Sequence, residues 1–471
     1  TVAVTITPVN DPPVCADLNE STPQGTARAV TVDCSDIDGD TLVYAVVSAP
    51  SHGSVTVSGP DFVYTPAEAY VGPDAFTFNA NDGAADSNSG SVTVRVDPVI
   101  AAAGDIADCN LLGDEITSAL LDDIDGTVVT LGDNVYDQGT FSEFMNCYEP
   151  SWGRHKVRTH PAVGNHEYED PAGGAQGYFD YMNGVGNFAG PAGDRDKGYY
   201  SFDLGEWHFV VINSSCSQIG GCDVGSLQET WLRADLAAHS AACTAAVWHH
   251  PRFSSGTEHG GTPRMESIWQ ALYHGGADIA MSGHEHNYER FAPQTATGVV
   301  DPAFGLREVV VGTGGKGGGY PFGPPEPNSE VRANDTLGVL KVVLRPAGFE
   351  WSFVHEPGAV FTDIGSGACH GQPDPANTVS PTVSGSPRQG RPLTVTPGTW
   401  VGSPPLTYAY QWRSCADVGA DSCTDIPGAT GSTYTPGPAE VGFRLRAVVT
   451  GTSAAGSTAA RSNKTNLIQP P

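Results

Sequence analysis

Polar side chains that can bind metal ions follow several short apolar runs in the middle of the sequence. The runs are VIAAAG, TVVTLG, PAVG, AAVWH and ADIAMSG. The residues that end or follow them are Asp105, Asp133, Asn165, His249, His284 and His286. Because strands of a layered α/β domain meet one crevice at their carboxyl ends, we expect these side chains to converge although they span about 180 positions. Oxygen and imidazole ligands without a thiolate suit iron, manganese or zinc.

Each motif alone also has an ordinary structural explanation. An Asp after a strand commonly forms a turn or a helix cap by accepting backbone N–H groups. His-His-Pro is commonly a packed or exposed loop, and GNHE could be a turn. Five such motifs in order, each at the end of an apolar run, make coincidence a poor explanation.

The series GDIAD, GDNVYD, GNHEYED, HHPRF and GHEHNYER resembles the calcineurin-like metallophosphoesterases, and most closely their purple acid phosphatase branch. The resemblance covers about residues 99–366, and GYYSFDLGEWHFVVINSS, SLQETWLRADL and EVVVGTGGKGG agree with it. The residue specific to this branch is Tyr136, three positions after Asp133, which in the purple enzymes is a ligand of ferric iron. The first motif departs from the family pattern GDxG, since Ala107 stands where the second glycine is expected.

The resemblance implies two metal ions, iron with zinc, manganese or a second iron, held by two sets of ligands. The first set is Asp105, Asp133, Tyr136 and His286. The second set is Asp133, Asn165, His249 and His284, with Asp133 bridging. His166 is implied to contact the substrate and its leaving group. His259, in SSGTEHGG, falls in the region of another substrate-contacting histidine, and a solvated loop histidine is the alternative.

These expectations describe a secreted acid phosphatase-like enzyme that hydrolyses phosphomonoesters through a metal-bound hydroxide. Two metal ions about 4 Å apart lower the pKa of a bridging water and bind phosphate oxygens. Two alternatives stay open. One is a phosphodiesterase or nucleotidase of the same superfamily, and the other is an adhesive extracellular protein with an inactive enzyme-like domain.

The elements that must position these residues form a layered α/β domain, predicted over 99–370. Short strands that are apolar on both faces alternate there with helices, which is the pattern of such a domain. One helix is predicted over 226–238. Another has Met265, Ile268, Trp269 and Leu272 on one face and ends at two glycines. The expected fold is therefore a multidomain chain, with a layered β-sandwich and flanking helices as its metallophosphoesterase core between two all-β sandwich domains.

Both flanks are predicted to be all-β. Residues 11–98 resemble bacterial cadherin-like repeats, and residues 1–10 are expected to be the end of a preceding repeat. Asp36, Asp38 and Asp40 are calcium candidates in this module, and a solvated turn without an ion is the alternative. A linker is predicted over 371–380. Residues 381–468 then resemble Ig-like repeats of exported bacterial proteins.

Composition limits the environment and the partners. The chain has 53 acidic and 23 basic residues, a net charge of −30 that repels nucleic acid and anionic membranes. A phosphate ester therefore needs a local positive centre, and an extracellular surface or matrix is a possible partner of the β modules. With no run of 18 apolar residues, no membrane span is predicted. The chain begins at Thr1 without a signal peptide, as expected of a mature product or a fragment.

Ten cysteines without a CxxC pair suggest disulfides in an oxidising compartment. The close pairs are Cys15 and Cys34, Cys109 and Cys147, Cys216 and Cys222, and Cys415 and Cys423. Cys243 and Cys369 are left over, and the sequence does not fix their connectivity.

Three further features are interpreted without catalytic roles. GTGGKGGG, at 312–319, lacks the Walker spacing and is predicted to be a mobile turn. Ser214 and Ser215 lie outside any GxSxG elbow. Glu285, between two predicted ligands, is expected to support them or to be solvated.

Overall fold

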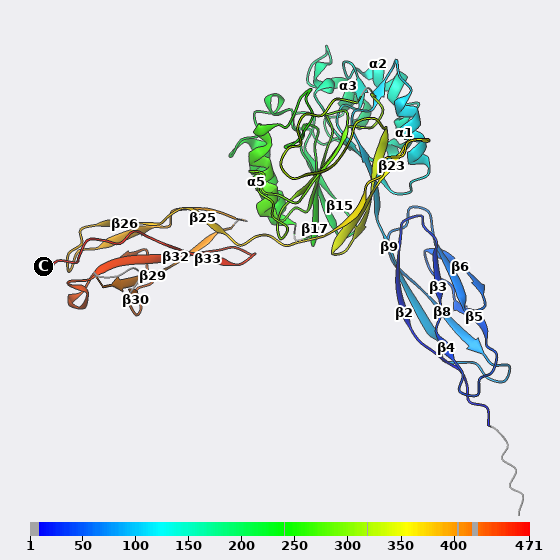
Figure 1. Cartoon of the computed structure of the whole chain (residues 1–471), viewed down its shortest axis with the longest axis horizontal. Helices are drawn as coiled ribbons and strands as arrows, with labels where there is room; N and C mark the ends of the chain where they lie inside the picture. Colours follow the sequence, from blue (N-terminus) through cyan, green and yellow to red (C-terminus); the bar gives the residue numbers. More distant parts are fainter. Residues whose placement is uncertain (1–8, 240, 318, 403–404, 417–422) are drawn as a thin grey trace, which may run out of the picture.

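The computed structural model describes residues 9–239, 241–317, 319–402, 405–416 and 423–471. Figure 1 shows a central α/β domain with one all-β module on each side. The fold class predicted from the sequence is confirmed. The predicted repeat end at 1–10 lies almost wholly outside the described residues. No helix among the described residues is long and apolar enough to cross a membrane.

Two mixed sheets pack face to face in the central domain. The first has six strands in the order β14 (Thr159–Ala162), β12 (Thr127–Leu131), β10 (Val99–Ala103), β22 (Gly338–Arg345), β23 (Gly348–His355) and β24 (Ile364–Ala368). The second has seven strands in the order β15 (Tyr200–Leu204), β16 (Trp207–Val211), β17 (Cys243–Val247), β18 (Ile279–Ser282), β20 (Arg307–Val311), β19 (Tyr288–Phe291) and β21 (Ser329–Ala333). Strands β10, β12 and β14 are parallel neighbours, as are β16, β17, β18 and β20.

Alternation along these strands separates two hydrophobic layers. Phe209 and Val211 of β16 belong to the core between the sheets, whereas Val210 belongs to the layer under the helices. That second layer includes residues of α4 (Leu227–Ala238) and α5 (Glu266–Gly275). Both helices were predicted, and Gly276 ends α5 in the left-handed conformation. The other α-helices among the described residues are α1 (Gly113–Asp122), α2 (Phe141–Glu143) and α3 (Gln176–Asn183).

The N-terminal module is a sandwich of a four-stranded and a three-stranded sheet, with a small two-stranded sheet beside them. Its strands are β1 (Val14–Cys15), β2 (Leu18–Pro23), β3 (Arg28–Thr31), β4 (Cys34–Ser35), β5 (Val43–Ser48), β6 (Gly53–Ser58), β7 (Asp61–Pro66), β8 (Gly72–Asn81) and β9 (Gly90–Asp97). Only Pro98 separates β9 from β10. Its carbonyl accepts the N–H of Leu344, and Arg345 pairs with the buried Asp97, so the two domains are joined directly.

The C-terminal module is also a β-sandwich. Its main sheet has the order β30 (Cys423–Asp425), β29 (Thr407–Cys415), β32 (Arg444–Thr452) and β33 (Ser457–Arg461). The other strands are β25 (Ala376–Val379), β26 (Thr382–Gly385), β27 (Leu393–Thr396), β28 (Thr399–Val401) and β31 (Thr433–Tyr434). Strand β25 lies within 371–380, where a linker was expected, and pairs with β28. This half of the segment therefore belongs to the module.

All ten cysteines form disulfides, including the four predicted close pairs. Cys243 and Cys369 form the fifth disulfide and close the longest loop, with a sequence separation of 126. This bond ties β17 of one central sheet to the end of β24 in the other. Pairing of all ten cysteines agrees with an oxidising environment.

A buried histidine ties the β15–β16 hairpin to α4. His208 Nδ1 lies 2.8 Å from Asp203, and Nε2 lies 2.8 Å from Asp235. The ring stacks on His239 at 4.0 Å. Burial lowers the pKa of His208, but hydrogen bonds and charges of Asp235 and Asp203 outweigh burial, so the pKa is raised.

We expect His208→Gln to lower the unfolding free energy by about 1–3 kcal/mol at a pH below about 6.5, the ordinary histidine pKa. A raised pKa stabilises the fold fully below the unfolded value, and this contribution is lost as the pH rises through the folded value. Calorimetric unfolding of both proteins at acidic and alkaline pH checks this. A difference that stays constant with pH would contradict the charge interpretation.

Candidate metal centre and active site

Six of the seven predicted metal ligands lie in loops at the carboxyl ends of strands, and the seventh, Tyr136, lies in the short strand β13 (Val135–Tyr136). Asp105 follows β10, Asp133 follows β12 and Asn165 follows β14 in the first sheet. His249 follows β17, and His284 and His286 follow β18 in the second sheet. Because the strands within each group are parallel, the loops of each group emerge at one edge of their own sheet. His249 of the second sheet lies beside Asp133 of the first, so the two edges meet.

Four of the predicted ligands form one cluster around the Tyr136 hydroxyl. This oxygen lies 2.8 Å from Asp105 Oδ1, 3.2 Å from Asp133 Oδ2 and 3.3 Å from His286 Nε2. All four side chains are buried. The cluster corresponds to the first ligand set expected from the sequence.

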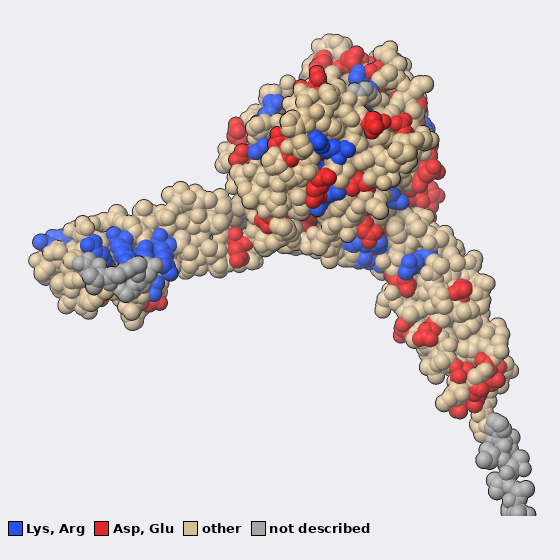
Figure 2. Space-filling model, in the orientation of Figure 1, with Lys and Arg blue, Asp and Glu red and all other residues tan. Residues whose placement is uncertain are grey.

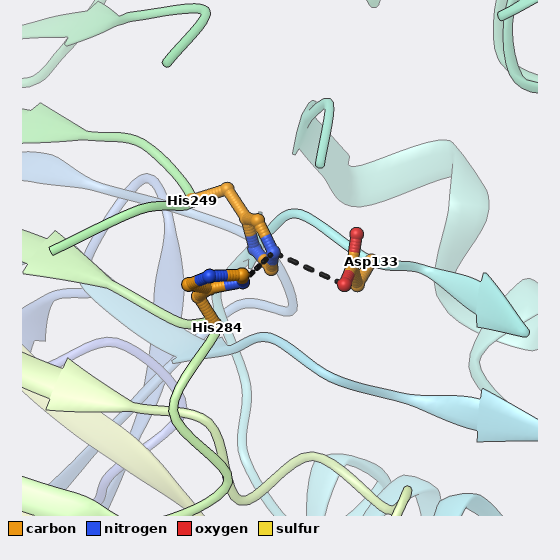
Figure 3. Close-up of side chains that lie close together, drawn as sticks. All are labelled: Asp133, His249 and His284. Carbon is orange, nitrogen blue, oxygen red and sulfur yellow. Dashed lines mark hydrogen bonds and ion pairs between the residues drawn. The ribbon is translucent and has the colours of Figure 1, made fainter. Parts of the chain in front are cut away.

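The other four-residue cluster surrounds His249 Nε2. This nitrogen lies 3.1 Å from Asp133 Oδ2, 3.1 Å from Asn165 Oδ1 and 3.2 Å from His284 Nδ1. Figure 3 shows His249 between His284 and Asp133. The same oxygen, Asp133 Oδ2, belongs to both clusters, so this carboxylate stands where a bridging ligand would stand.

The atoms that surround His249 Nε2 in the second cluster are arranged to bind a cation. His249 Nδ1 donates to the Leu131 carbonyl at 2.9 Å, so a neutral ring presents the lone pair of Nε2 to two oxygen acceptors. Burial lowers the pKa of His249, yet Asp133 and Asp105 overcome it and raise the pKa to about 9. Burial also raises the pKa of the fully enclosed Asp105 carboxyl. The donor set therefore fits metal cations.

Three of these residues have strained backbone. Asp105, Asp133 and His284 have φ values of 60°, 47° and 73°, in the left-handed region that residues other than glycine seldom adopt. Such strain persists where the surrounding structure enforces it, and it is concentrated at functional sites. Here it turns each side chain back towards the common centre directly after its strand.

The glycines directly before Asp133, Asn165 and His284 are required by close packing. A Cβ on Gly132 would lie 2.6 Å from His249 Cβ, and one on Gly283 would lie 2.7 Å from Asp105 Oδ2. A Cβ on Gly164 would lie 2.1 Å from Asp133 Oδ1. The G-D, G-N and G-H pairs of the sequence thus reflect ligand loops that touch one another.

We expect Gly132→Ala to weaken metal affinity and kcat/KM by about 10- to 100-fold, the scale of lost support to a metal ligand. Gly173→Ala is a matched control, because the two φ values are 84° and 79° and nothing lies within 4 Å of the added Cβ at Gly173. Elemental analysis and steady-state kinetics of both variants check this. Equal effects of the two substitutions would show that backbone strain alone is responsible.

Sequence reasoning missed the role of Glu167, two positions after Asn165. This buried carboxylate accepts backbone N–H groups from Gly164 at 2.6 Å, Asn134 at 2.6 Å and Asp133 at 3.2 Å. It therefore holds the loops of Asp133 and Asn165 together. Its place within GNHE was the available signal, but the sequence cannot show which backbone groups it meets.

The two predicted substrate histidines lie at the border of the clusters. His166 is partly exposed, its ring lies 4.5 Å from that of Tyr136, and its Nδ1 donates to the Asp137 carbonyl at 2.6 Å. His259 stacks on His284 with 4.2 Å between ring centroids. Tyr320, which was not predicted, stacks on His286 at 4.0 Å. Aromatic rings thus border the ligand histidines on this side.

The segment predicted as a mobile turn is packed against the site. Gly314 N donates to the Gly104 carbonyl, and Lys316 N donates to that of Asp105, each at 2.9 Å. The Lys316 ammonium lies 4.4 Å from the Tyr136 ring centroid and pairs with Asp108 at 2.5 Å. The prediction of a mobile turn was therefore wrong: glycines allow the close approach, and the lysine covers one face of the tyrosine.

Asp36, Asp38 and Asp40, the calcium candidates, lie close together in the N-terminal module. Asp36 Oδ1 accepts the backbone N–H groups of Asp38 at 2.8 Å and Gly39 at 3.0 Å. This arrangement is an Asx turn, which forms with or without an ion. Calcium binding stays a prediction.

Comparison with known families defines two of the domains. Residues 98–288 match the calcineurin-like phosphoesterase family and residues 10–95 the bacterial Ig domain. The chain thus carries a calcineurin-like phosphoesterase domain behind a bacterial Ig domain. The cadherin-like resemblance of the first module stays a prediction.

Curated proteins that are similar to this chain include purple acid phosphatases. Purple acid phosphatase 23 of Arabidopsis thaliana is 33% identical over 159 residues, which are 30% of this chain and 33% of that protein. Probable inactive purple acid phosphatase 9 of the same plant is 29% identical over 207 residues, 37% of this chain and 31% of that protein. The chain spans about a third of the length of these relatives.

One solved structure that the chain matches is a purple acid phosphatase from yellow lupin (Lupinus luteus) seeds. Its TM-score is 0.46 at 18% identity, over 77% of this chain and 75% of that one.

Proposed function

We propose that this chain is a dinuclear metal-dependent phosphoesterase that hydrolyses phosphomonoesters. The observation that carries the proposal is the pair of four-residue donor clusters that share Asp133 Oδ2. Asp105, Tyr136 and His286 would complete one metal site, and Asn165, His249 and His284 the other. The phenol oxygen of Tyr136 suits iron at the first site, and the second site suits zinc, manganese or iron. The chemistry that such a pair supplies is charge neutralisation of the ester and acidification of the attacking water.

The protein's own groups orient the substrate around these ions. His166 is fixed by its Nδ1–H bond to the Asp137 carbonyl, which leaves Nε2 as the atom that can carry a proton to the leaving oxygen. His259 stacks on His284, and we expect it to contact a phosphate oxygen. Lys316 lies beside Tyr136, where its ammonium pairs with Asp108 and Asp137.

Hydrolysis of a chromogenic phosphomonoester and its matching diester, from acidic to neutral pH, tests the proposal. We expect faster turnover of the monoester, with activity lost on metal removal. Preference for the diester would move the assignment to a phosphodiesterase or nucleotidase. No turnover of either ester by protein with two bound ions would overturn the catalytic proposal. That result would favour the adhesive alternative, in line with the relative named as probably inactive.

Secretion is part of the proposal, since five disulfides favour an oxidising compartment. The C-terminal module differs in charge from the rest of the chain. Residues 381–471 hold seven Lys and Arg against four Asp and Glu, and basic side chains gather on one face of this module (Figure 2). Arg413 and Arg446 stand directly opposite each other across β29 and β32, and Arg413 also pairs with Asp425.

This basic face supports an anionic extracellular polysaccharide as the partner that places the enzyme on a surface. Retention of the whole chain on a sulfated polysaccharide column should fall in the R413A/R446A double variant, with phosphatase activity unchanged. Identical elution of both proteins would contradict the assignment.

A further inference from the structure

A buried carboxylate links the metal-ligand loop to the loop of His259. Glu285 lies between His284 and His286 and is fully buried. Its Oε1 accepts the backbone N–H groups of His259 at 2.8 Å and Gly260 at 2.5 Å. Its Oε2 is buried without a hydrogen-bond partner in the part of the chain that the structure describes. The carboxylate thus faces the substrate loop and not solvent.

Other contacts hold residues 252–257, the first part of this loop. Glu308 accepts the N–H groups of Arg252 and Phe253, each at 2.9 Å, and Glu289 accepts that of Ser255 at 2.7 Å. Thr257 N donates to the Pro321 carbonyl at 3.0 Å, which pairs the loop with the segment of Tyr320. Beyond Thr257, the bonds to Glu285 are, among the described residues, the backbone hydrogen bonds that tie the exposed His259 to the loop of His284 and His286.

Local packing makes room for this carboxylate. A Cβ on Gly256 would lie 2.3 Å from Glu285 Cδ, so glycine lets the loop pass directly over the side chain. Two backbone N–H groups, those of His259 and Gly260, converge on the single oxygen Glu285 Oε1. The His259 ring is thereby held flat against His284, with 26° between the ring planes.

We propose that Glu285 is a positioning residue that holds His259 in place for binding the phosphate group of the substrate. The proposal rests on the phosphoesterase function and adds how the site fixes its substrate-binding loop. Glu285 links the metal site to the substrate-binding loop. It lies between the proposed metal ligands His284 and His286, and it also orders His259. It acts through His259 and is not itself a catalytic residue.

Three single variants and one double variant of the metal-loaded protein test this inference. Glu285→Ala should raise KM for a phosphomonoester and the inhibition constant of inorganic phosphate by about tenfold, because His259 is expected to bind the phosphate group equally in the ground and transition states. Glu285→Gln keeps the Oε1 acceptor and should stay close to wild type. His259→Ala should match Glu285→Ala, and the double variant should show no further loss, because residues that act through one another are not additive.

Two further measurements separate positioning from a general defect and from failure of the proposed function. The Glu285 and His259 variants should all keep two metal ions per chain. Amide hydrogen exchange over 257–261 should be faster in Glu285→Ala than in wild type or Glu285→Gln. Exchange and phosphate binding are measurable even if neither ester is hydrolysed. Unchanged exchange, loss of metal in Glu285→Ala, or additive effects with His259→Ala would each overturn the inference.

Discussion

Asp133→Ala is expected to lower kcat/KM for a phosphomonoester at least about 10³-fold, equivalent to about 4 kcal/mol of transition-state stabilisation. Asp133 Oδ2 lies within 3.2 Å of both Tyr136 Oη and His249 Nε2, so its removal takes one donor from each cluster. Metal content should fall below two ions per chain. No other single side chain of the site belongs to both clusters.

Asp123→Ala is the matched control, since this carboxylate is exposed at the end of α1. It should leave metal content and kinetics unchanged. Retention of two ions and of most activity by Asp133→Ala would contradict the bridging role. Circular dichroism of both variants separates a site defect from unfolding.

His166→Ala is expected to lower kcat by about 10²- to 10⁴-fold, the usual contribution of a positioned proton donor. The loss should be larger for alkyl than for nitrophenyl phosphate, because a poor leaving group depends more on protonation. Metal content should stay at two ions, since His166 lies beside the clusters and its Nδ1 bonds to a backbone carbonyl.

His370→Ala is the control for this variant. Its backbone N–H bonds to Asp278, beside the start of β18, whereas the ligands follow the end of that strand. An equal loss for both leaving groups would contradict the role of His166 in proton transfer. Loss of metal would instead make His166 part of the ligand support.

The ligand series was predictable because it depends on short-range rules. A strand that is apolar on both faces, followed by glycine and a polar residue, identifies a loop at the end of a parallel strand. Asp105, Asp133 and His284 all fit that pattern. The helices α4 and α5 were predictable for a similar reason, since their apolar residues repeat at helical spacing and glycines end the second one.

Support of the site depends on distant pairings that the sequence does not reveal. Lys316 reaches the Tyr136 ring across 180 positions of chain, and Glu285 meets backbone groups about 25 positions away. Backbone N–H groups carry no sequence signature, so a buried glutamate that binds them looks like a solvated one. The role of GTGGKGGG was missed because its glycines serve close packing, whereas a phosphate loop was the pattern considered.

Restoration of activity to metal-stripped protein tests the central claim most directly. Iron and zinc would be added stepwise, and phosphomonoester turnover would be measured against the bound metal per chain. The account predicts that activity is absent without metal and reaches its plateau at two ions per chain. Activity that persists without metal, or that never appears with two ions bound, would contradict it.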